Sequence, residues 1–476
     1  MSTTVYHGSL INPATPTAYE ARQRSLLAVN SQGIIDWVVH NVESSLVQQT
    51  LLQRGCLDAQ VVDLLDGQFL MPGFVDTHTR EQHAPQVPNL GTGYQYELLD
   101  WLEKFTFPLE AKFKDVEFAK NTYPSVVKKF IASGTTTCCY YGSLHLDSTK
   151  TLADIVHSLG QRALIGKCNM DTHCPSYYIE ESADASVKDT HSFIAHVQSL
   201  SPGPSNDPNN PLIFPVLTPR FAISCSRDLL GFLQLVAASD PHLHIQTHIS
   251  ENVKEIQFTK ELFPECRHYA EVYDKYGMLR KNTILAHGVH LDDEEIDLIV
   301  KRKAGLSHCP TSNFNLRSGI APIGKFLDRG MKVGLGTDVS GGFSPSMLVA
   351  IRNASIASTA VAVTHTLGKE EEEGKFSNRQ LPLATLLYLA TKGGAEVCEL
   401  DHRIGSLDPG KSFDALIVDV RDGAGGSVGR SNPGMWGSRG GTLDDQLGRF
   451  IFCGDDRNIS AVFVQGRLVG GTSSGL

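Results

Sequence analysis

Histidine and aspartate residues stand at the ends of several apolar runs that are typical of strands. His78 ends "GFVDTH", His248 ends "HLHIQTH", His287 ends "NTILAH" and Asp338 ends "KVGLGTD". One histidine at a strand end is weak evidence for chemistry, because a structural, hydrogen-bonded histidine is commoner. Three imidazoles and a carboxylate together match a catalytic zinc site that leaves one position open for water. Such a metal lowers the pKa of its bound water toward ~7 and supplies hydroxide at neutral pH.

Further polar and aromatic residues follow the same strand ends. Glu251 lies three residues after His248, and a carboxylate there can move protons between the water and a leaving group. Arg220 and Phe221 follow "FPVLTP" and offer hydrogen-bond donors and a stacking surface. Two simpler alternatives stay open, because Arg220 could pair with a carboxylate and Phe221 could belong to the core. Asn313 is expected to shape the pocket.

The first strand end has an unusual spacing. Four residues separate His78 from a second histidine, His83, in "HTREQH". Residues i and i+2 of a strand point to the same side, whereas residues i and i+5 point to opposite sides. His78 and His83 therefore cannot hold one ion on a regular strand, and we expect residues 80–82 to loop out and bring His83 back. Two alternatives stay open: one ligand is lost, or Glu81 replaces His78.

These side chains need a scaffold that brings many strand ends together. Between residues 72 and 404, apolar strands with polar ends alternate with helical stretches, an order that predicts a parallel sheet. Eight such strand ends suit an α/β fold, a TIM-like (β/α)8 barrel with its chemistry at the carboxyl ends of the strands. Residues 1–71 and 405–476 are predicted to form one small, discontinuous β-sandwich domain, with a Gly-rich loop at 423–442.

The composition argues against several other classes of protein. The 476 residues carry a net charge of −10 and no visible basic patch, so a nucleic-acid partner is not expected. The N-terminus lacks the features of a secretory signal, and no uninterrupted run of ~18 apolar residues occurs, so no membrane association is expected. The ten cysteines include no C-x-x-C pair, which is typical of reduced thiols in a cytoplasmic protein.

The strand ends resemble those of the amidohydrolase superfamily, through "PGFVDTH", "THISE", "LAHG" and "GLGTD". Within it the chain is similar to the guanine deaminase family, through "HAPQ", "LLDWLEKFTFPLE", "TPRFAISCS" and "SHCPTSNFNLRSG". These segments extend over most of the barrel, from about Met71 to Leu348. The resemblance implies hydrolytic deamination of guanine to xanthine and ammonia, one zinc ion (Zn2+) per subunit and a homodimer.

The resemblance also implies roles for particular residues. Asp338 would take a proton from the attacking water, Glu251 would protonate the ring nitrogen beside the carbon under attack, and His287 would assist near the metal. The zinc ligands would be His78, His83, His248 and Asp338. The residues that contact the substrate would be His83, Gln86, Arg220, Phe221, His248, Glu251 and Asp338, although Gln86 could instead be an ordinary loop residue.

Two rival functions stay open. Another enzyme of the superfamily could act on a triazine, on adenosine or on another cyclic amidine, as a deaminase or a chlorohydrolase. The barrel could also be an inactive or metal-free binding protein because of residues 80–82. A splicing or gene-model origin of these residues is a related hypothesis, since Gln82 can be encoded by CAG, the triplet with which introns often end.

Overall fold

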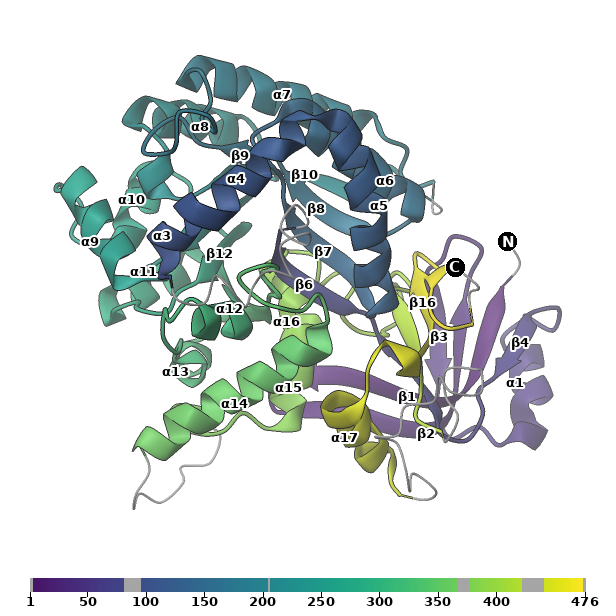
Figure 1. Ribbon diagram of the computed structural model, residues 1–476. Coiled ribbons are helices and arrows are strands. Elements are labelled where there is room, and N and C mark those ends of the chain that lie inside the picture. The colour runs from purple at the N-terminus through teal and green to yellow at the C-terminus, as the bar shows by residue number, and fades with distance from the viewer. Residues whose placement is uncertain (1–2, 81–95, 204–205, 366–375, 422–440, 474–476) are drawn as a thin grey trace.

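A barrel dominates the computed structural model, which describes residues 3–80, 96–203, 206–365, 376–421 and 441–473 (Figure 1). Parallel strands follow one another around it in chain order, and β9 (Cys168–Asn169) continues beside one of them. The barrel strands are β6 (Phe74–Thr79), β7 (Thr135–Tyr141), β8 (Arg162–Gly166), β10 (Ile213–Pro219), β11 (His244–Ile249), β12 (Thr283–His287), β13 (Gly305–His308) and β14 (Lys332–Leu335). These are the eight strands expected from the sequence, so the (β/α)8 class is confirmed.

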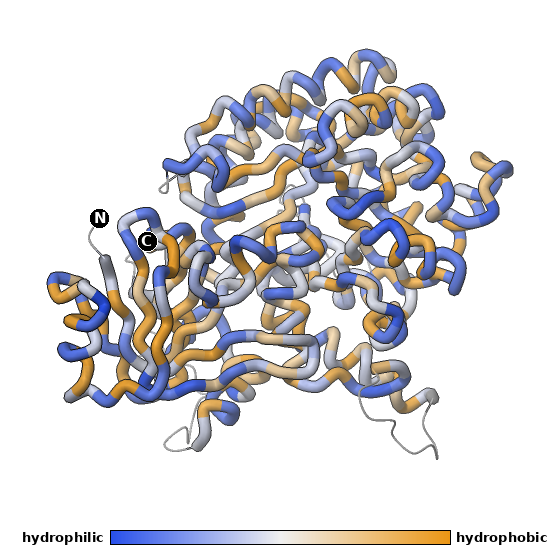
Figure 2. The backbone as a smooth tube through the Cα atoms, turned by 180° about the vertical axis from the view of Figure 1, so that it is seen from behind, coloured by the Kyte–Doolittle hydropathy of each residue, from blue (hydrophilic) through white to orange (hydrophobic). Residues whose placement is uncertain are grey.

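Helices connect the barrel strands and cover their outer side (Figure 1). Capping residues explain where some begin, since Ser226 accepts from the Leu229 N–H and Asp292 forms a reciprocal capping box with Glu295. Figure 2 shows hydrophobic stretches along the strands and mixed hydropathy along the outer helices, as expected of helices that cover a core. These helices are α5 (Val116–Ala132), α6 (Leu146–Leu159), α7 (Ala183–Ser199), α8 (Arg227–Ser239), α9 (Val253–Leu262), α10 (Tyr269–Lys275), α11 (Asp293–Arg302), α12 (Pro310–Asn315), α13 (Ile323–Asp328), α14 (Met347–His365), α15 (Leu383–Ala390) and α16 (Lys392–Val397).

The segment before α5 forms a series of short helical pieces: α3 (Leu98–Trp101), the π-helical η3 (Leu102–Thr106), α4 (Phe107–Glu110) and η4 (Ala111–Lys114). A further short turn, η5 (Ala222–Ser224), follows β10. The apolar side chains of α3, η3 and α4 share one buried cluster with Phe221. This segment, which contains "LLDWLEKFTFPLE", therefore packs over the strand end that carries Phe221.

The barrel closes where its last strand, β14, meets its first, β6. The Thr77 hydroxyl donates to the Leu335 carbonyl at 2.9 Å, and the Asp338 N–H donates to the His78 carbonyl at 2.9 Å. The Thr337 N–H donates to Asp76 Oδ1 at 3.0 Å. Closure thus places Asp338 beside His78, although 260 positions of sequence separate them.

A second, mixed sheet combines strands from both ends of the chain. Its order is β17-β16-β15-β5-β1-β2-β3, with β4 beside β1, and β15 pairs antiparallel with β5. Its strands are β1 (Thr4–Thr15), β2 (Ala18–Val29), β3 (Ile35–Val39), β4 (Gln60–Asp63), β5 (Gln68–Pro72), β15 (Ala415–Asp419), β16 (Ile459–Val464) and β17 (Arg467–Gly470). The expected joining of the two termini is confirmed, whereas the domain bounds 1–71, 405–476 and 72–404 stay predictions.

Smaller elements complete the terminal region: η1 (Ser44–Leu46), α1 (Val47–Gln53), α17 (Leu443–Cys453) and η7 (Asp456–Asn458). The Gly-rich loop predicted at 423–442 lies outside the described residues except for its last two positions. A buried ion pair joins the two sheets, because Arg162 of β8 contacts both carboxylate oxygens of Asp414, at 2.8 and 3.3 Å. Removal of one partner of such a buried pair lowers the free energy of unfolding by about 3–5 kcal/mol. This ion pair therefore holds the terminal sheet against the barrel.

Among the described residues, one helix is long and apolar enough to cross a membrane. Its window, Met347–Thr364, lies in α14, and 39% of that window is buried. Core helices pass the same test of length and composition, so this is weak evidence for a membrane segment.

Candidate active site

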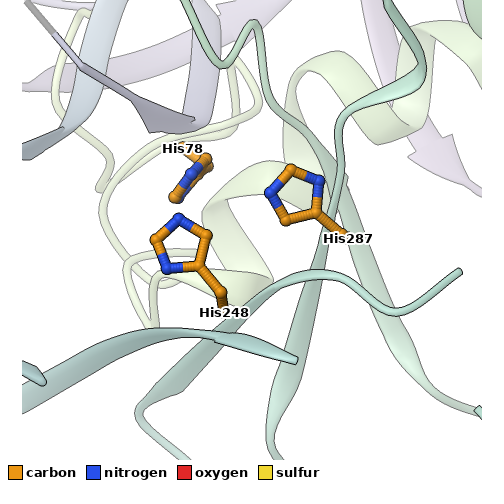
Figure 3. A group of neighbouring side chains, drawn as sticks. All are labelled: His78, His248 and His287. Carbon is orange, nitrogen blue, oxygen red and sulfur yellow. The ribbon is translucent and has the colours of Figure 1, made fainter. Parts of the chain in front are cut away.

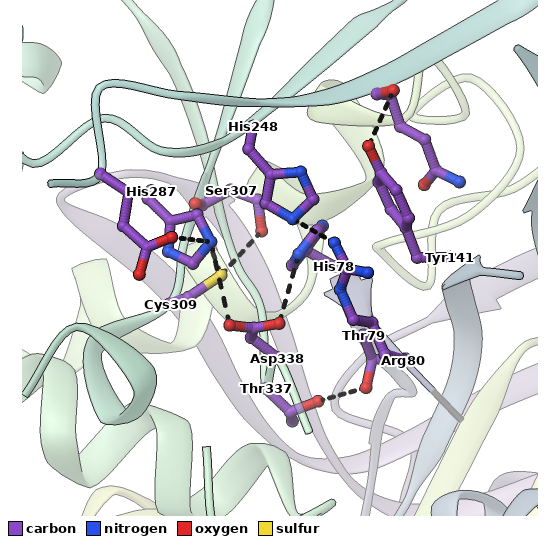
Figure 4. Close-up of polar contacts among 12 residues, drawn as sticks. His78, Thr79, Arg80, Tyr141, His248, His287, Ser307, Cys309, Thr337 and Asp338 are labelled. Carbon is purple, nitrogen blue, oxygen red and sulfur yellow. Dashed lines mark hydrogen bonds and ion pairs between the residues drawn. The ribbon is translucent and has the colours of Figure 1, made fainter. Parts of the chain in front are cut away.

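Histidines from three strands converge at the carboxyl end of the barrel (Figure 3). His78 of β6, His248 of β11 and His287 of β12 are buried, and each offers one ring nitrogen within 4.8 Å of the others. Asp338 joins them from the loop after β14, with Oδ1 3.3 Å from His78 Nε2 and Oδ2 3.8 Å from His287 Nε2 (Figure 4). The structure therefore brings together three predicted imidazoles and the predicted aspartate.

Hydrogen bonds to the outer ring nitrogens fix two of these imidazoles. His248 Nδ1 donates to the Arg220 carbonyl at 2.5 Å, so the lone pair of this neutral ring lies on Nε2. His287 Nδ1 contacts Asn313 Oδ1 at 2.9 Å, so Asn313 holds this ring, and its shaping of the pocket stays a prediction. His78 Nε2 is buried and faces Asp338 Oδ1 at 3.3 Å, without the geometry of a hydrogen bond. Imidazoles held in this way from outside are typical of metal ligands, so the donor set fits a divalent cation.

The electrostatics of the histidines also fit a metal. Burial lowers the pKa of His78 to about 4 and lowers the pKa of His248 well below its ordinary value. Both rings are therefore neutral at pH 7, the form that binds a metal. Burial also opposes the charge on His287, but the carboxylates of Glu251 and Asp338 outweigh it and raise the pKa of His287. His287 can thus carry a proton where the other two cannot.

The pKa values of two carboxyl groups of the site are shifted in opposite directions. Burial raises the pKa of Glu251, whose Oε1 accepts from the Ser318 hydroxyl at 3.0 Å. Burial acts to raise the pKa of Asp338 too, but the contact with His78 and nearby positive charges outweigh it and lower that pKa. Paired groups with separated pKa values are typical of acid and base roles. The arrangement can therefore offer a protonated Glu251 and an ionised Asp338.

Arg220 has the partner that the simpler sequence alternative expected. Its Nη1 and Nη2 donate to the two oxygens of Glu110, at 2.7 and 3.1 Å, and both residues are buried. Arg220 also lines the cavity at the barrel mouth, as Phe221 does. Each of these residues is therefore packed or paired and also borders the cavity, and their contact with a substrate stays a prediction.

The cavity at the histidine cluster is small. Its volume is about 30 Å³, room for roughly two water molecules and far below the ~300–1,000 Å³ of typical ligand pockets. It is lined by Arg80, Leu98, Trp101, Leu102, Arg220, Phe221, His248, Glu251, Glu255, His287, Leu316 and Asp338.

The expectation that Arg80 loops out of the site is wrong. Arg80 is buried, its N–H donates to the Val339 carbonyl at 3.2 Å, and its Nη2 lies 2.6 Å from His248 Nε2 (Figure 4). The physical reason lies in its contacts: Arg80 directly follows β6, its backbone N–H is held by the Val339 carbonyl, and its guanidinium lies between His248 and Glu110. His83, Gln86 and Glu81 lie outside the described residues, and their roles stay predictions.

Sequence reasoning missed several residues of the site, among them Glu110 and Tyr141. Glu110 ends the segment "LLDWLEKFTFPLE", whose only sequence signal is the family resemblance, and it faces Arg220. Tyr141 ends strand β7, and its ring lies 4.8 Å from the His248 ring and 5.3 Å from the His78 ring. A polar aromatic residue at a strand end was the available signal for Tyr141. His308 lies apart, in the lining of a different cavity between α13 and α14.

Comparison with known proteins agrees with this geometry. A model of the amidohydrolase family matches residues 69–469. A probable guanine deaminase of Schizosaccharomyces pombe is 44% identical over 92% of this chain and 79% of its own length. The guanine deaminase of Dictyostelium discoideum is 39% identical over 98% of both chains. A crystal structure of C. acetobutylicum guanine deaminase with bound guanine superposes with a TM-score of 0.82 at 33% identity, over 98% of this chain and 100% of that one.

Proposed function

The chain belongs to the amidohydrolase family, and from this premise we propose that it converts guanine and water to xanthine and ammonia. Relatives named guanine deaminase span almost the whole chain. The observation that carries the proposal is the meeting of His78, His248, Asp338 and Glu251 at one end of the barrel. These residue types suit metal-assisted hydrolysis in which carboxyl groups move the protons.

The family and the histidine cluster imply a divalent metal, and we propose that it is one zinc ion. His78, His248 and Asp338 would hold it, and His83 would complete the set. A zinc ion bound there would lower the pKa of its water toward ~7. His78 and His248 suit this role because burial keeps them neutral.

The protein's own carboxyl groups would move the protons. Asp338, with its lowered pKa, is ionised at pH 7 and would accept a proton from the attacking water. Glu251, with its raised pKa, would give a proton to the ring nitrogen beside the carbon under attack. His287 lies between them, 3.4 Å from Glu251 and 3.8 Å from Asp338, and would assist the transfer.

The purine would be held by groups around the cavity. An arginine is a donor for the carbonyl oxygen of guanine, and Glu110 would keep the Arg220 guanidinium in one orientation. Phe221 would provide a stacking surface, and Gln86 would contact the purine edge.

One experiment tests function and metal together: zinc content and ammonia release from guanine, measured on the full chain and on a chain that lacks residues 80–82. We expect about one zinc per chain and ammonia release from at least the shortened protein. Activity of both forms would mean that residues 80–82 are tolerated. If both bind zinc and neither releases ammonia from guanine, the proposed function is wrong.

A second candidate is a different deaminase or hydrolase of the same fold. An adenosine deaminase at 20% identity and a triazine hydrolase at 19% superpose with TM-scores of 0.75 and 0.76, which shows the fold alone. Turnover of adenosine or a triazine without turnover of guanine would favour it. An absence of both metal binding and turnover in both forms of the chain would favour a binding protein.

We further propose a cytoplasmic homodimer with no nucleic-acid or membrane partner. The molar mass in solution, from light scattering, would test the dimer, and a monomer at micromolar concentration would contradict it. Fractionation of cells would test the location.

A further inference from the structure

The end of β6 places a guanidinium among the groups that would bind the metal. Arg80 Nη2 lies 2.6 Å from His248 Nε2, and Arg80 Nη1 lies 3.4 Å from Glu110 Oε1. The guanidinium also lies over the Tyr141 ring, 4.4 Å from its centroid. Figure 4 shows the Arg80 side chain extending toward the His248 ring from the strand end that also carries His78.

The contact with His248 uses the one lone pair that a metal would need. His248 Nδ1 donates to the Arg220 carbonyl, so Nε2 carries no hydrogen and can only accept. An arginine has donors and no acceptor, so Arg80 Nη2 must donate to this Nε2. An imidazole nitrogen has a single lone pair in the ring plane. It can accept this hydrogen bond or coordinate a cation, and it cannot do both at once.

We propose that the Arg80 guanidinium competes with the metal for His248 Nε2. The guanidinium must move away from this nitrogen before a divalent ion can bind there. This inference rests on the proposed zinc-dependent function and concerns the regulation of the same site. Metal loading and withdrawal of Arg80 are then one coupled step, and the apparent metal affinity is reduced by the fraction of molecules in which Arg80 occupies the site.

The contacts of Arg80 explain why its occupied position is stable. A buried charge needs a counter-charge, and Glu110 supplies one while it also pairs with Arg220. The ring of Tyr141 adds a cation–π contact. The backbone of Arg80 is fixed as well, through its N–H bond to Val339. Only the side chain has to move for a metal to enter.

The same side chain also accounts for part of the small size of the cavity. Arg80 lines the space of about 30 Å³ together with Arg220, Phe221 and Glu251. Withdrawal of Arg80 would free both the His248 lone pair and volume beside it. One movement would therefore prepare the site for the metal and for a purine.

The test is a zinc titration of chelator-treated protein, by calorimetry or a competing chromophoric chelator, without substrate. The variants are Arg80→Ala and Arg80→Met; the second keeps an unbranched side chain and covers the case in which the alanine variant does not fold. If Arg80 occupies the site in 90–99% of molecules, its removal tightens zinc binding about tenfold to hundredfold. Arg467→Ala, at an exposed position on β17, removes the same charge far along the chain and should leave zinc affinity unchanged.

The outcomes separate this proposal from the proposed function. Equal zinc affinity in wild type, Arg80→Ala and Arg80→Met would overturn the competition, whatever the activity. Weaker binding in both variants would also overturn it and would make Arg80 a support of the metal site. Tighter zinc binding in the two Arg80 variants would sustain the competition. If, in addition, neither the wild type nor the variants released ammonia from guanine once loaded with zinc, the proposed function would be contradicted.

Discussion

The site has two sides that differ in how they present their histidines. At the ends of β11 and β12, His248 and His287 have their outer ring nitrogens held by fixed oxygens, and Glu251 and Asp338 stand beside them. At the end of β6, His78 shares its side of the strand with the guanidinium of Arg80. On the proposals above, the first side would carry the proton transfers and the second would control access of the metal, so chemistry and metal loading would be separable.

Substitution of Glu251 by glutamine tests this separation and is expected to have the largest effect on activity. The change keeps the shape but removes the proton that Glu251 would donate, and loss of a general acid costs about 10²–10⁴ in rate. We expect kcat for ammonia release to fall by that amount while zinc content stays at the wild-type value. Loss of zinc in Glu251→Gln would show that the two sides are not independent.

Removal of the Arg220 side chain should affect the substrate more than the metal. Arg220→Ala takes away the proposed donor to guanine and leaves Glu110 buried without its bidentate partner. We expect KM for guanine to rise about tenfold to hundredfold, the value of a lost charge-assisted hydrogen bond, together with lower stability. Glu110→Gln tests positioning, because Arg220 remains but is no longer held by a charge. An unchanged KM in both variants would mean that the purine site is misassigned.

The fold could be predicted from sequence because each barrel strand is an apolar run that ends in a polar residue, and closure of such a barrel brings the ends together. His78, His248, His287 and Asp338 were found by that rule. Glu110 was not, because it lies on a short helix, 110 positions from Arg220, and only the packing of α4 against the barrel mouth brings them together. The position of Arg80 could not be predicted from the spacing of His78 and His83, because it depends on contacts with Val339 and His248, which are distant in sequence. The positions of His83 and Gln86 stay predictions.

Glu255 provides a pH test on the side of the site that carries the chemistry. Burial, followed by the charge of Glu251, raises the pKa of Glu255 to about 7, against ~4.3 in an unfolded chain. The folded state therefore binds the proton more tightly. The contribution of Glu255 to stability is complete below pH ~4.3 and is lost as the pH rises through about 7.

Glu255→Gln removes this titration while an amide oxygen can still accept from the Glu251 and Asn252 N–H groups. We expect the variant to gain about 1–3 kcal/mol over wild type between pH 5 and pH 8, measured by urea unfolding. Glu261→Gln, at an exposed position on the same helix, is the matched control and should show no such gain. A stability difference that does not change with pH would contradict a pKa of about 7 for Glu255 in the folded protein.

The smallest expected effect comes from Ser318, which donates to Glu251 Oε1 at 3.0 Å. This hydrogen bond stabilises the ionised carboxylate and so lowers the pKa of Glu251, against the stronger effect of burial that raises it. Ser318→Ala should therefore raise that pKa further. Because Glu251 must be protonated to act, activity is lost as the pH rises above its pKa, and the alkaline limb of kcat/KM should move to higher pH. The zinc affinity of Ser318→Ala should equal that of wild type, because Ser318 contacts the acid and none of the metal-binding nitrogens among the described contacts. A shift of the alkaline limb to lower pH, or no shift, would show that a group other than Glu251 sets this limb. The proton donor would then be another residue at the carboxyl ends of the barrel strands, and His287 would be the first to test.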